Sequence, residues 1–325
     1  PGPSILLRAD MDALPMQEDT DLEFKSKIEG RMHACGHDSH TAMLALAARL
    51  LDRHRDEMAG NVVLMFQPGE EGYFGAMVMI EEGLLDGVPD LGAAFAIHIN
   101  PLHPPGVVAS RPGPIMAAAD IFQVILKGKG GHASMPHDAV DPIPVACEIV
   151  QALQTLVTRR IDVFDPVVLT VSQIRAGSTT NVIPESARLL GTLRSTSEKA
   201  RERAQEGIRR VATQIAAAHE VEPEIVVVNG YPVTVNDAEF SGFVRTVATD
   251  LLGADAYLDM PAPMMGAEDF SCVLHRVPGA MVALGVRPAG EGPRAPVHSN
   301  HMMLNEDGMQ AGIALHAAVA LRYLE

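Results

Sequence analysis

The chain has 325 residues, of which 47% are hydrophobic and only 4% aromatic, and it carries a formal net charge of −16. Because it is about twice as long as a typical single domain, we expect one large and one smaller domain, with cores of Ala, Val, Ile, Leu and Met. The acidic balance argues against a nucleic-acid-binding protein, and the lack of a run of ~18 apolar residues or of a secretory leader predicts a cytoplasmic protein without a membrane partner.

Strand-like and helical segments alternate over the first hundred residues. Strands are expected at 5–9, 61–66 and 93–98, and helices at about 41–54 and 75–82. This alternation predicts an α/β fold with a mostly parallel sheet, in which ligands bind at the carboxyl ends of the strands. The first strand begins almost at residue 1, so we expect that an N-terminal segment is missing from the sequence or left unnumbered.

The pattern changes near Ala117. Strands at 121–127, 167–176, 186–194 and 224–228 then enclose helices at 142–159 and 198–220, in an order that resembles a split βαβ sandwich. The last third returns to the first pattern, with helices at 238–252, 268–276 and 306–324 and a strand at 280–286. We therefore expect a catalytic domain made of residues 1–116 and 230–325, interrupted by an inserted α+β domain at 117–229.

The densest group of chemically active residues is the segment 32–40, Met-His-Ala-Cys-Gly-His-Asp-Ser-His. Imidazole and thiolate are ligands that suit zinc and similar ions, and Cys35 and His37 can share one ion or serve two. With only three cysteines, the chain has too few for a disulfide framework. The alternative is a helix cap, with Asp38 or Ser39 capping and the histidines simply exposed.

Two adjacent carboxylates, Glu70 and Glu71, follow the strand at 61–66 in a turn rich in Pro and Gly. Neighbouring residues in such a turn point in different directions. One carboxylate can therefore bind a metal ion while the other faces the substrate as a general base. A solvated pair is the alternative, which the rigid turn after an apolar strand disfavours.

Two single histidines complete a ligand set. His98 ends the third strand, and His298 lies in Pro-Val-His-Ser-Asn near the C-terminal end. A lone histidine after an apolar strand is more often a core residue. Cys35, His37, Glu71, His98 and His298 together, however, are sufficient for two metal ions that share a bridging ligand.

At this point the sequence resembles the aminoacylase/carboxypeptidase family of di-metal peptidases, in the branch of hippurate hydrolases and auxin-conjugate amidohydrolases. The resemblance covers essentially the whole chain. Its seven ordered markers are the segments 8–15, 33–38, 67–72, 130–137, 181–184, 191–194 and 266–270.

The resemblance implies roles for the site residues. Cys35 takes a bridging place between two divalent ions (Zn, Mn, Co or Ni), with His37 and His98 on one ion and Glu71 and His298 on the other. Glu70 is implied as the general base, which activates a metal-bridging water and then protonates the leaving amine. Asp12 is implied to orient a metal-binding histidine, and Asp10, which stands where other branches place a histidine ligand, is interpreted as structural.

The resemblance also gives the insert a role, as the lid and dimerisation domain of a homodimer or homotetramer. His132 matches a residue that reaches across the dimer to stabilise the oxyanion. Asn181 and Arg194 match positions that help to hold the substrate through its carboxylate, and a hydrogen-bond network within the insert is the alternative for both residues. Asn300 departs from the family, which usually has Pro there, so the substrate preference cannot be copied.

The expected function is metal-dependent hydrolysis of the amide bond of N-acyl amino acids. The alternatives are an exo- or dipeptidase with the same di-metal site, or a non-catalytic binding protein of the same fold. The complete ligand set with Glu70 argues against the latter. The sequence leaves open the acyl group, the amino acid, the native metal and the oligomeric state.

Overall fold

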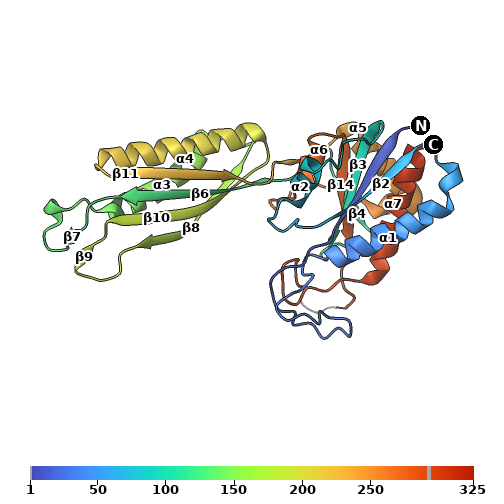
Figure 1. Cartoon of the computed structure of the whole chain (residues 1–325), viewed down its shortest axis with the longest axis horizontal. Helices are drawn as coiled ribbons and strands as arrows, with labels where there is room; N and C mark the ends of the chain where they lie inside the picture. Colours follow the sequence, from blue (N-terminus) through green and yellow to red (C-terminus); the bar gives the residue numbers. More distant parts are fainter. Residues whose placement is uncertain (1, 291–293) are drawn as a thin grey trace. The chain divides into compact units, whose positions relative to one another are not determined.

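The structure is a computed structural model that describes residues 2–290 and 294–325 (Figure 1). The chain divides into two compact units, each described by itself below. Unit 1 consists of Pro1–Ile115, Thr234–Ala262 and Asp269–Glu325, and unit 2 consists of Met116–Val233 and Pro263–Glu268.

Unit 1 is built around a sheet whose described strands follow the order β13-β4-β14-β3-β1-β2. The strands are β1 (Ser4–Asp10), β2 (Asn61–Gln67), β3 (Leu91–Asn100), β4 (Val108–Ser110), β13 (Tyr257–Asp259) and β14 (Gly279–Gly285). All neighbouring pairs run parallel except β14 with β4. The prediction of a mainly parallel sheet is therefore confirmed, although the three-residue strands β4 and β13 were not expected.

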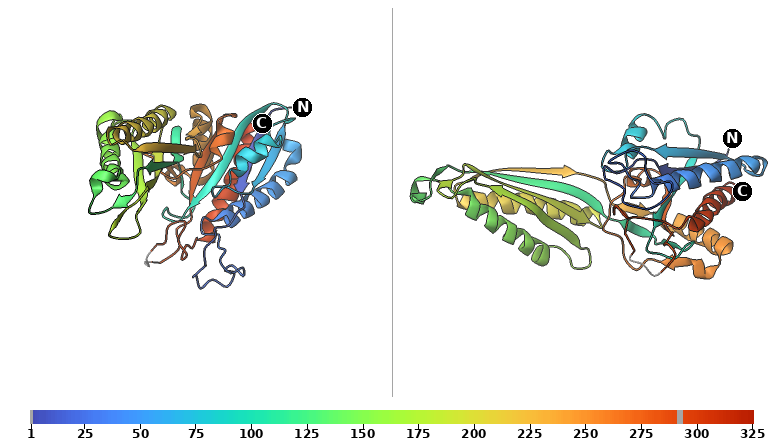
Figure 2. Two further views of the ribbon diagram at one scale, coloured as in Figure 1. Left: turned by 60° about the vertical axis from the view of Figure 1, so that its left-hand side comes forward. Right: turned by 90° about the horizontal axis from the view of Figure 1, so that it is seen from below.

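Helices cover the sheet of unit 1 and complete its core. They are α1 (His37–Arg53), α2 (Gly75–Glu81), α5 (Ala238–Leu252), α6 (Ser271–Leu274) and α7 (Met309–Tyr323). α1 and α7 pack against each other and against β1 (Figures 1 and 2). Every residue of β1 is buried, as expected for a strand covered on both faces. Asp237 caps α5 by accepting a hydrogen bond from the backbone N–H of Phe240, 2.8 Å away.

The boundary of α1 matters for the site. The expected helix at 41–54 begins at His37 instead, directly after Gly36. Gly36 has a φ of 83°, and a Cβ there would lie 2.6 Å from the Ile99 side chain, so only glycine fits this turn. As a result, His37 and His40 project from the first turn of a helix and are held rigidly.

Two C-terminal helices also differ from expectation. The helix expected at 268–276 is limited to α6, because the side chain of Asp269 enters a buried polar network and the chain before Ser271 is not helical. The last helix, expected from residue 306, begins at Met309 after a 3₁₀ turn over Glu306–Gly308.

Unit 2 has an antiparallel sheet of the order β11-β6-β10-β8 and two long helices. Its elements are β6 (Ala118–Lys127), α3 (Pro142–Arg160), β8 (Val167–Ala176), β10 (Ser186–Ser195), α4 (Glu198–Ala218) and β11 (Glu222–Asn229). Side chains of β6 and β10 alternate between buried and more exposed positions, and the buried face packs with α3 and α4 around one apolar core. This is the order of a split βαβ sandwich.

Short strands make up the remaining elements. β7 (Gly131–His132) pairs with β9 (Val182–Ile183) in unit 2, and β5 (Gly113–Met116) pairs with β12 (Thr234–Asn236). Among the residues that the structure describes, none of the helices combines the length and the apolar character needed to span a membrane.

Candidate metal centre

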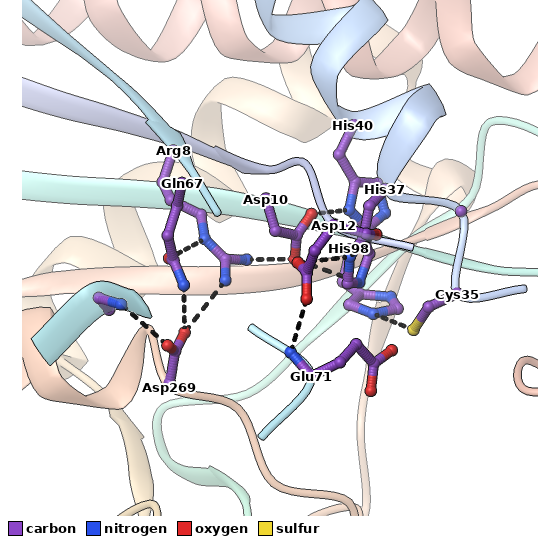
Figure 3. Close-up of polar contacts among 12 residues, drawn as sticks. Arg8, Asp10, Asp12, Cys35, His37, His40, Gln67, Glu71, His98 and Asp269 are labelled. Carbon is purple, nitrogen blue, oxygen red and sulfur yellow. Dashed lines mark hydrogen bonds and ion pairs between the residues drawn. The ribbon is translucent and has the colours of Figure 1, made fainter. Parts of the chain in front are cut away.

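Polar side chains gather where the parallel strands β1, β2 and β3 end. Asp10, the last residue of β1, pairs in register with Gln67, the last residue of β2. His98 lies near the end of β3, and the Glu70–Glu71 turn follows β2 directly. The beginning of α1 brings His37 to the same place, as Figure 3 shows. The carboxyl edge of a parallel sheet is where ligand sites in this fold class form.

Cys35, His37 and His98 form the first ligand group. Their potential donor atoms lie within 4.8 Å of one another. Sγ of Cys35 is 3.4 Å from Nε2 of His98. Cys35 and His37 are buried, so the donors are shielded from solvent. A thiol and two imidazoles at this separation match the ligands that zinc and similar ions prefer.

Cys35, Glu71 and His298 form the second ligand group, within the same 4.8 Å limit. Nε2 of His298 is 3.1 Å from Oε1 of Glu71. His298 has a φ of 66°, and its backbone N–H donates to the carbonyl of Ala34 at 2.7 Å. A non-glycine residue in this conformation costs about 1–3 kcal/mol, which functional sites tolerate. Cys35 belongs to both groups, so its thiol lies within reach of the donor atoms of each.

Hydrogen bonds orient the imidazoles of His37 and His98. Nδ1 of His37 lies 3.0 Å from the Asp12 carbonyl oxygen and 3.3 Å from Asp12 Oδ1, and Nδ1 of His98 lies 2.7 Å from the Ile99 carbonyl oxygen. Since a carbonyl oxygen only accepts, each Nδ1 carries the hydrogen and each Nε2 keeps its lone pair. This is the arrangement in which metal-binding histidines are usually held.

The donor set fits a pair of divalent ions. Nε2 of His37 is buried and makes no hydrogen bond, and it lies 3.5 Å from Asp10 Oδ2, an acceptor that cannot satisfy a lone pair. The Cys35 thiol and the carboxylates of Glu70 and Glu71 lie around it, and these groups can donate electron pairs or negative charge to a metal cation. A metal ion would satisfy these groups together.

Glu70 and Asp12 complete the surroundings of the ligands. Glu70 is buried, and its carboxylate lies within 4.8 Å of the donor atoms of His37 and Glu71. Asp12 uses Oδ2 to accept a hydrogen bond from the Glu71 backbone N–H at 2.9 Å, in addition to its contact with His37. Asp12 therefore links a ligand of the first group to the turn that carries both glutamates.

Asp10 is occupied by other partners. Its carboxylate accepts from Arg8 Nη1 at 2.7 Å and from His40 Nδ1 at 2.6 Å, and His40 Nε2 accepts from the Ile99 backbone N–H at 2.9 Å. Burial lowers the pKa of His40 to about 3, so this imidazole is neutral. Burial raises the pKa of Asp10, but Arg8 and His40 outweigh burial and hold that pKa well below its usual range.

Arg8 also donates to Gln67, which donates to Asp269, so the hydrogen bonds around Asp10 extend to both residues. Four residues of this hydrogen-bond network were not assigned a role from the sequence. They are Arg8, His40, Gln67 and Asp269. Arg8, Gln67 and Asp269 lie within three of the seven markers, and His40 lies in the segment 32–40, so the signal was their position beside the catalytic candidates.

His132, Asn181 and Arg194 belong to unit 2, whereas the candidate metal ligands belong to unit 1. His132 Nδ1 accepts a hydrogen bond from the Ser134 backbone N–H at 3.2 Å. The neighbouring Ala133 N–H donates to the Asn181 carbonyl at 3.1 Å, so these two loops are joined. Arg194 lies on β10. The roles of all three residues stay predictions.

Three curated proteins resemble the chain over most of their length. It is 41% identical over 326 residues to thermostable carboxypeptidase 1 of Saccharolobus solfataricus, covering 99% of this chain and 81% of that one. It is 43% identical over 327 residues to IAA-amino acid hydrolase ILR1-like 2 of Arabidopsis thaliana, covering 99% and 73%. It is 38% identical over 324 residues to N-acetylcysteine deacetylase of Bacillus subtilis, covering 100% and 82%.

A solved structure and a family model agree with these relatives. The Bacillus subtilis YXEP protein, described as a dinuclear metal binding peptidase from the M20 family, superposes with a TM-score of 0.85 at 34% identity, covering 99% of this chain and 82% of that one. The model of peptidase family M20/M25/M40 matches residues 6–322. Since this match spans nearly the whole chain, the protein belongs to peptidase family M20/M25/M40.

Proposed function

We propose that this protein is a metal-dependent amidohydrolase that cleaves the amide bond of N-acyl amino acids. The observation that carries the proposal is the position of Cys35 in two ligand groups at once, with the Glu70 carboxylate beside them. The names of two relatives, an IAA-amino acid hydrolase and an N-acetylcysteine deacetylase, indicate acylated amino acids as the substrate class.

The five ligands divide between two divalent ions. His37 and His98 would hold one ion and Glu71 and His298 the other, and Cys35 would be a ligand within reach of both groups. When bound, the ions polarise the substrate carbonyl and lower the pKa of water. Zn, Mn, Co and Ni all accept such mixed N, O and S donors.

Glu70 is the general base and then the general acid. Its carboxylate takes a proton from the attacking water and delivers it to the leaving amine as the tetrahedral intermediate collapses. Burial excludes bulk water from this carboxylate, which keeps the proton in the site. Asp12 holds the tautomer of His37 and the backbone at Glu71, so that ligands and base keep a fixed geometry.

Unit 2 supplies substrate contacts in this proposal. The inserted domain at 117–229 acts as the lid and as the dimerisation surface of a homodimer or homotetramer. His132 of one subunit stabilises the oxyanion in the other, and Asn181 with Arg194 binds the substrate carboxylate. The exposed position of His132 is compatible with a contact to a second subunit.

A carboxypeptidase is the second candidate, because a relative with 41% identity carries that name. An N-acyl amino acid and a peptide substrate of a carboxypeptidase both present an amide bond next to a free carboxylate. A dipeptide also presents a free α-amine, which needs an acidic partner, whereas an acyl group needs none.

The first experiment is elemental mass spectrometry of unchelated protein, together with amine release from N-acetyl, N-benzoyl and longer N-acyl amino acids and from matching dipeptides. We expect two ions per chain and hydrolysis of the acyl amino acids that stops on chelation. Faster turnover of dipeptides would favour the carboxypeptidase, and inert protein after addition of zinc or manganese would refute both.

A further inference from the structure

The carboxylate of Asp269 accepts hydrogen bonds from at least three donors in the interior of unit 1 (Figure 3). Oδ2 accepts from the Ala76 backbone N–H at 2.9 Å, and Oδ1 accepts from Gln67 Nε2 at 2.6 Å and from Arg8 Nη2 at 3.4 Å. Asp269, Gln67 and Arg8 are at most 1% exposed. A buried carboxylate with three donors is strongly constrained in position.

Two of these donors lie at opposite ends of the catalytic turn, which we define as residues 68–75. Gln67 is the last residue of β2, immediately before the turn, and Ala76 lies in the first turn of α2, immediately after it. One carboxylate therefore ties together the entry and the exit of the segment that carries Glu70 and Glu71. Asp269 is about two hundred positions away in sequence and does not belong to the turn itself.

The catalytic turn is tightly packed between Gln67 and Ala76, the two residues that Asp269 anchors. The Gly75 N–H donates to the Gly69 carbonyl at 3.0 Å. A Cβ at Gly75 would lie only 1.6 Å from the Pro68 carbonyl oxygen, so the two ends of the turn are in direct contact. A shift of either anchor therefore changes the direction in which both glutamates point.

We call Asp269 with its hydrogen-bond partners Gln67 and Ala76 the clamp. Arg8 connects this clamp to the rest of the site. Its Nε donates to Gln67 Oε1 at 2.8 Å, and its Nη1 donates to Asp10 Oδ2 at 2.7 Å. Asp10 in turn accepts from His40 on the first helical turn after His37. The network thus joins the ends of β1 and β2 with the beginnings of α1 and α2, the elements that lead to ligands of both groups.

We propose that Asp269, together with Arg8 and Gln67, is a positioning device that holds the catalytic turn so that Glu70 faces the substrate and Glu71 faces the second ligand group. This inference rests on the proposed function for the consequence on turnover. Its structural consequence, a catalytic turn ordered by Asp269, holds whatever the substrate is.

The test is Asp269→Asn in the full chain. Ala76, Gln67 and Arg8 each present an N–H donor to Asp269, so an amide of the same shape sets one of its own N–H groups against one of these donors and breaks that hydrogen bond. We expect faster hydrogen exchange in peptides that cover 68–76 of the metal-free protein. We also expect one of two Zn²⁺ equivalents to bind about 10–100-fold more weakly in calorimetric titration, because Glu71 belongs to the second ligand group and not to the first.

The kinetic parameters of Asp269→Asn distinguish a misplaced base from general destabilisation of the fold. For a hydrolysed N-acyl amino acid, kcat should fall about 10²-fold with KM within about twofold, because the base is misplaced while substrate binding is kept.

Asp120→Asn in unit 2 is the matched control. Asp120 is also buried and also accepts from an arginine, a glutamine side chain and a backbone N–H, namely Arg201, Gln205 and Gly230. This variant should lose comparable folding stability while exchange at 68–76 and both Zn²⁺ affinities stay at the wild-type values.

Gln67→Met provides a second variant in case Asp269→Asn does not fold. It removes the hydrogen bonds of the Gln67 side chain to Asp269 and to Arg8, but it leaves the hydrogen bond from the Ala76 backbone N–H to Asp269. It should produce the same changes, smaller in size. Wild-type exchange at 68–76 and two unchanged Zn²⁺ affinities in folded Asp269→Asn or Gln67→Met would overturn the clamp. Inert wild-type enzyme would refute the proposed function, while exchange and Zn²⁺ binding still decide on the clamp.

Discussion

At the residue scale, the two adjacent glutamates Glu70 and Glu71 are proposed to have different roles. Glu70 and Glu71 are neighbours in sequence, yet only Glu71 joins the second ligand group with Cys35 and His298. Cys35 is the residue common to both groups. Replacing Glu70, the proposed base, and replacing Cys35, the thiol common to both groups, should therefore have different consequences.

Glu70→Gln should bind metal as the wild type does but turn over about 10²–10⁴-fold more slowly, because the amide keeps the shape of the side chain and cannot accept the proton. Metal content by elemental mass spectrometry and kcat on an N-acyl amino acid check both statements. Near-normal kcat in the metal-loaded variant would rule out Glu70 as the base.

Cys35→Ser should lower the metal content at both positions, because an alcohol does not replace a thiolate that serves two ions. Cys147→Ser is the control, since Cys147 is an exposed residue of unit 2. Equal metal content in the two variants would show that Cys35 is not a ligand.

At the scale of elements, α1 and α7 each bring a fully buried histidine into unit 1, His40 and His316. His316 packs its ring against Phe95 at 5.3 Å between centroids, and its Nδ1 makes no hydrogen bond. Burial lowers the pKa of His316 to about 3, so the folded protein holds this imidazole neutral.

This burial predicts a pH dependence of stability. The unfolded chain protonates His316 near pH 6.5, whereas the folded protein resists protonation down to about 3. The free energy of unfolding should therefore be fully retained above pH 6.5 and fall on acidification, with His316 contributing roughly 1.4 kcal/mol per pH unit.

His316→Leu should remove this contribution. Urea unfolding between pH 7.5 and pH 5 measures it, as the difference in slope between wild type and variant. Parallel stability curves for the two proteins would contradict the assignment of a neutral His316.

At the scale of the whole molecule, the five proposed ligands come from four separate stretches of unit 1, around Cys35, Glu71, His98 and His298. Metal binding should therefore stabilise unit 1 as a body. Unit 2 has its own apolar core, formed by β6, β8, β10, α3 and α4, and contributes none of the five ligands.

Chelation should abolish hydrolysis and lower hydrogen-exchange protection in β1, β3 and α1, with little change in β6 and β10. Loss of a ligand present at about 100 times its Kd removes about 2.7 kcal/mol of stabilisation. Peptide-level exchange with and without chelator, followed by Zn²⁺ addition, measures this. Equal loss of protection in both units would contradict a site confined to unit 1.

Much of the fold could be predicted from local patterns. Helix α5 and strand β8 have the bounds that the sequence predicted, because a capping Asp237 and a regular strand pattern define them locally. Short strands such as β4 could not be predicted, since three residues carry no periodicity of their own and pair only because β14 lies beside them.

The sequence by itself determined which donors exist and which elements carry them, because thiol, imidazole and carboxylate chemistry belongs to the residue and strand or helix periodicity to its neighbours. Only the tertiary structure decided that Cys35 lies in reach of both His98 and His298, and that Asp269 closes the turn of Glu70 and Glu71. These contacts join residues that are tens to hundreds of positions apart. They follow from strand register and from the need of buried charges for partners, which no local pattern specifies.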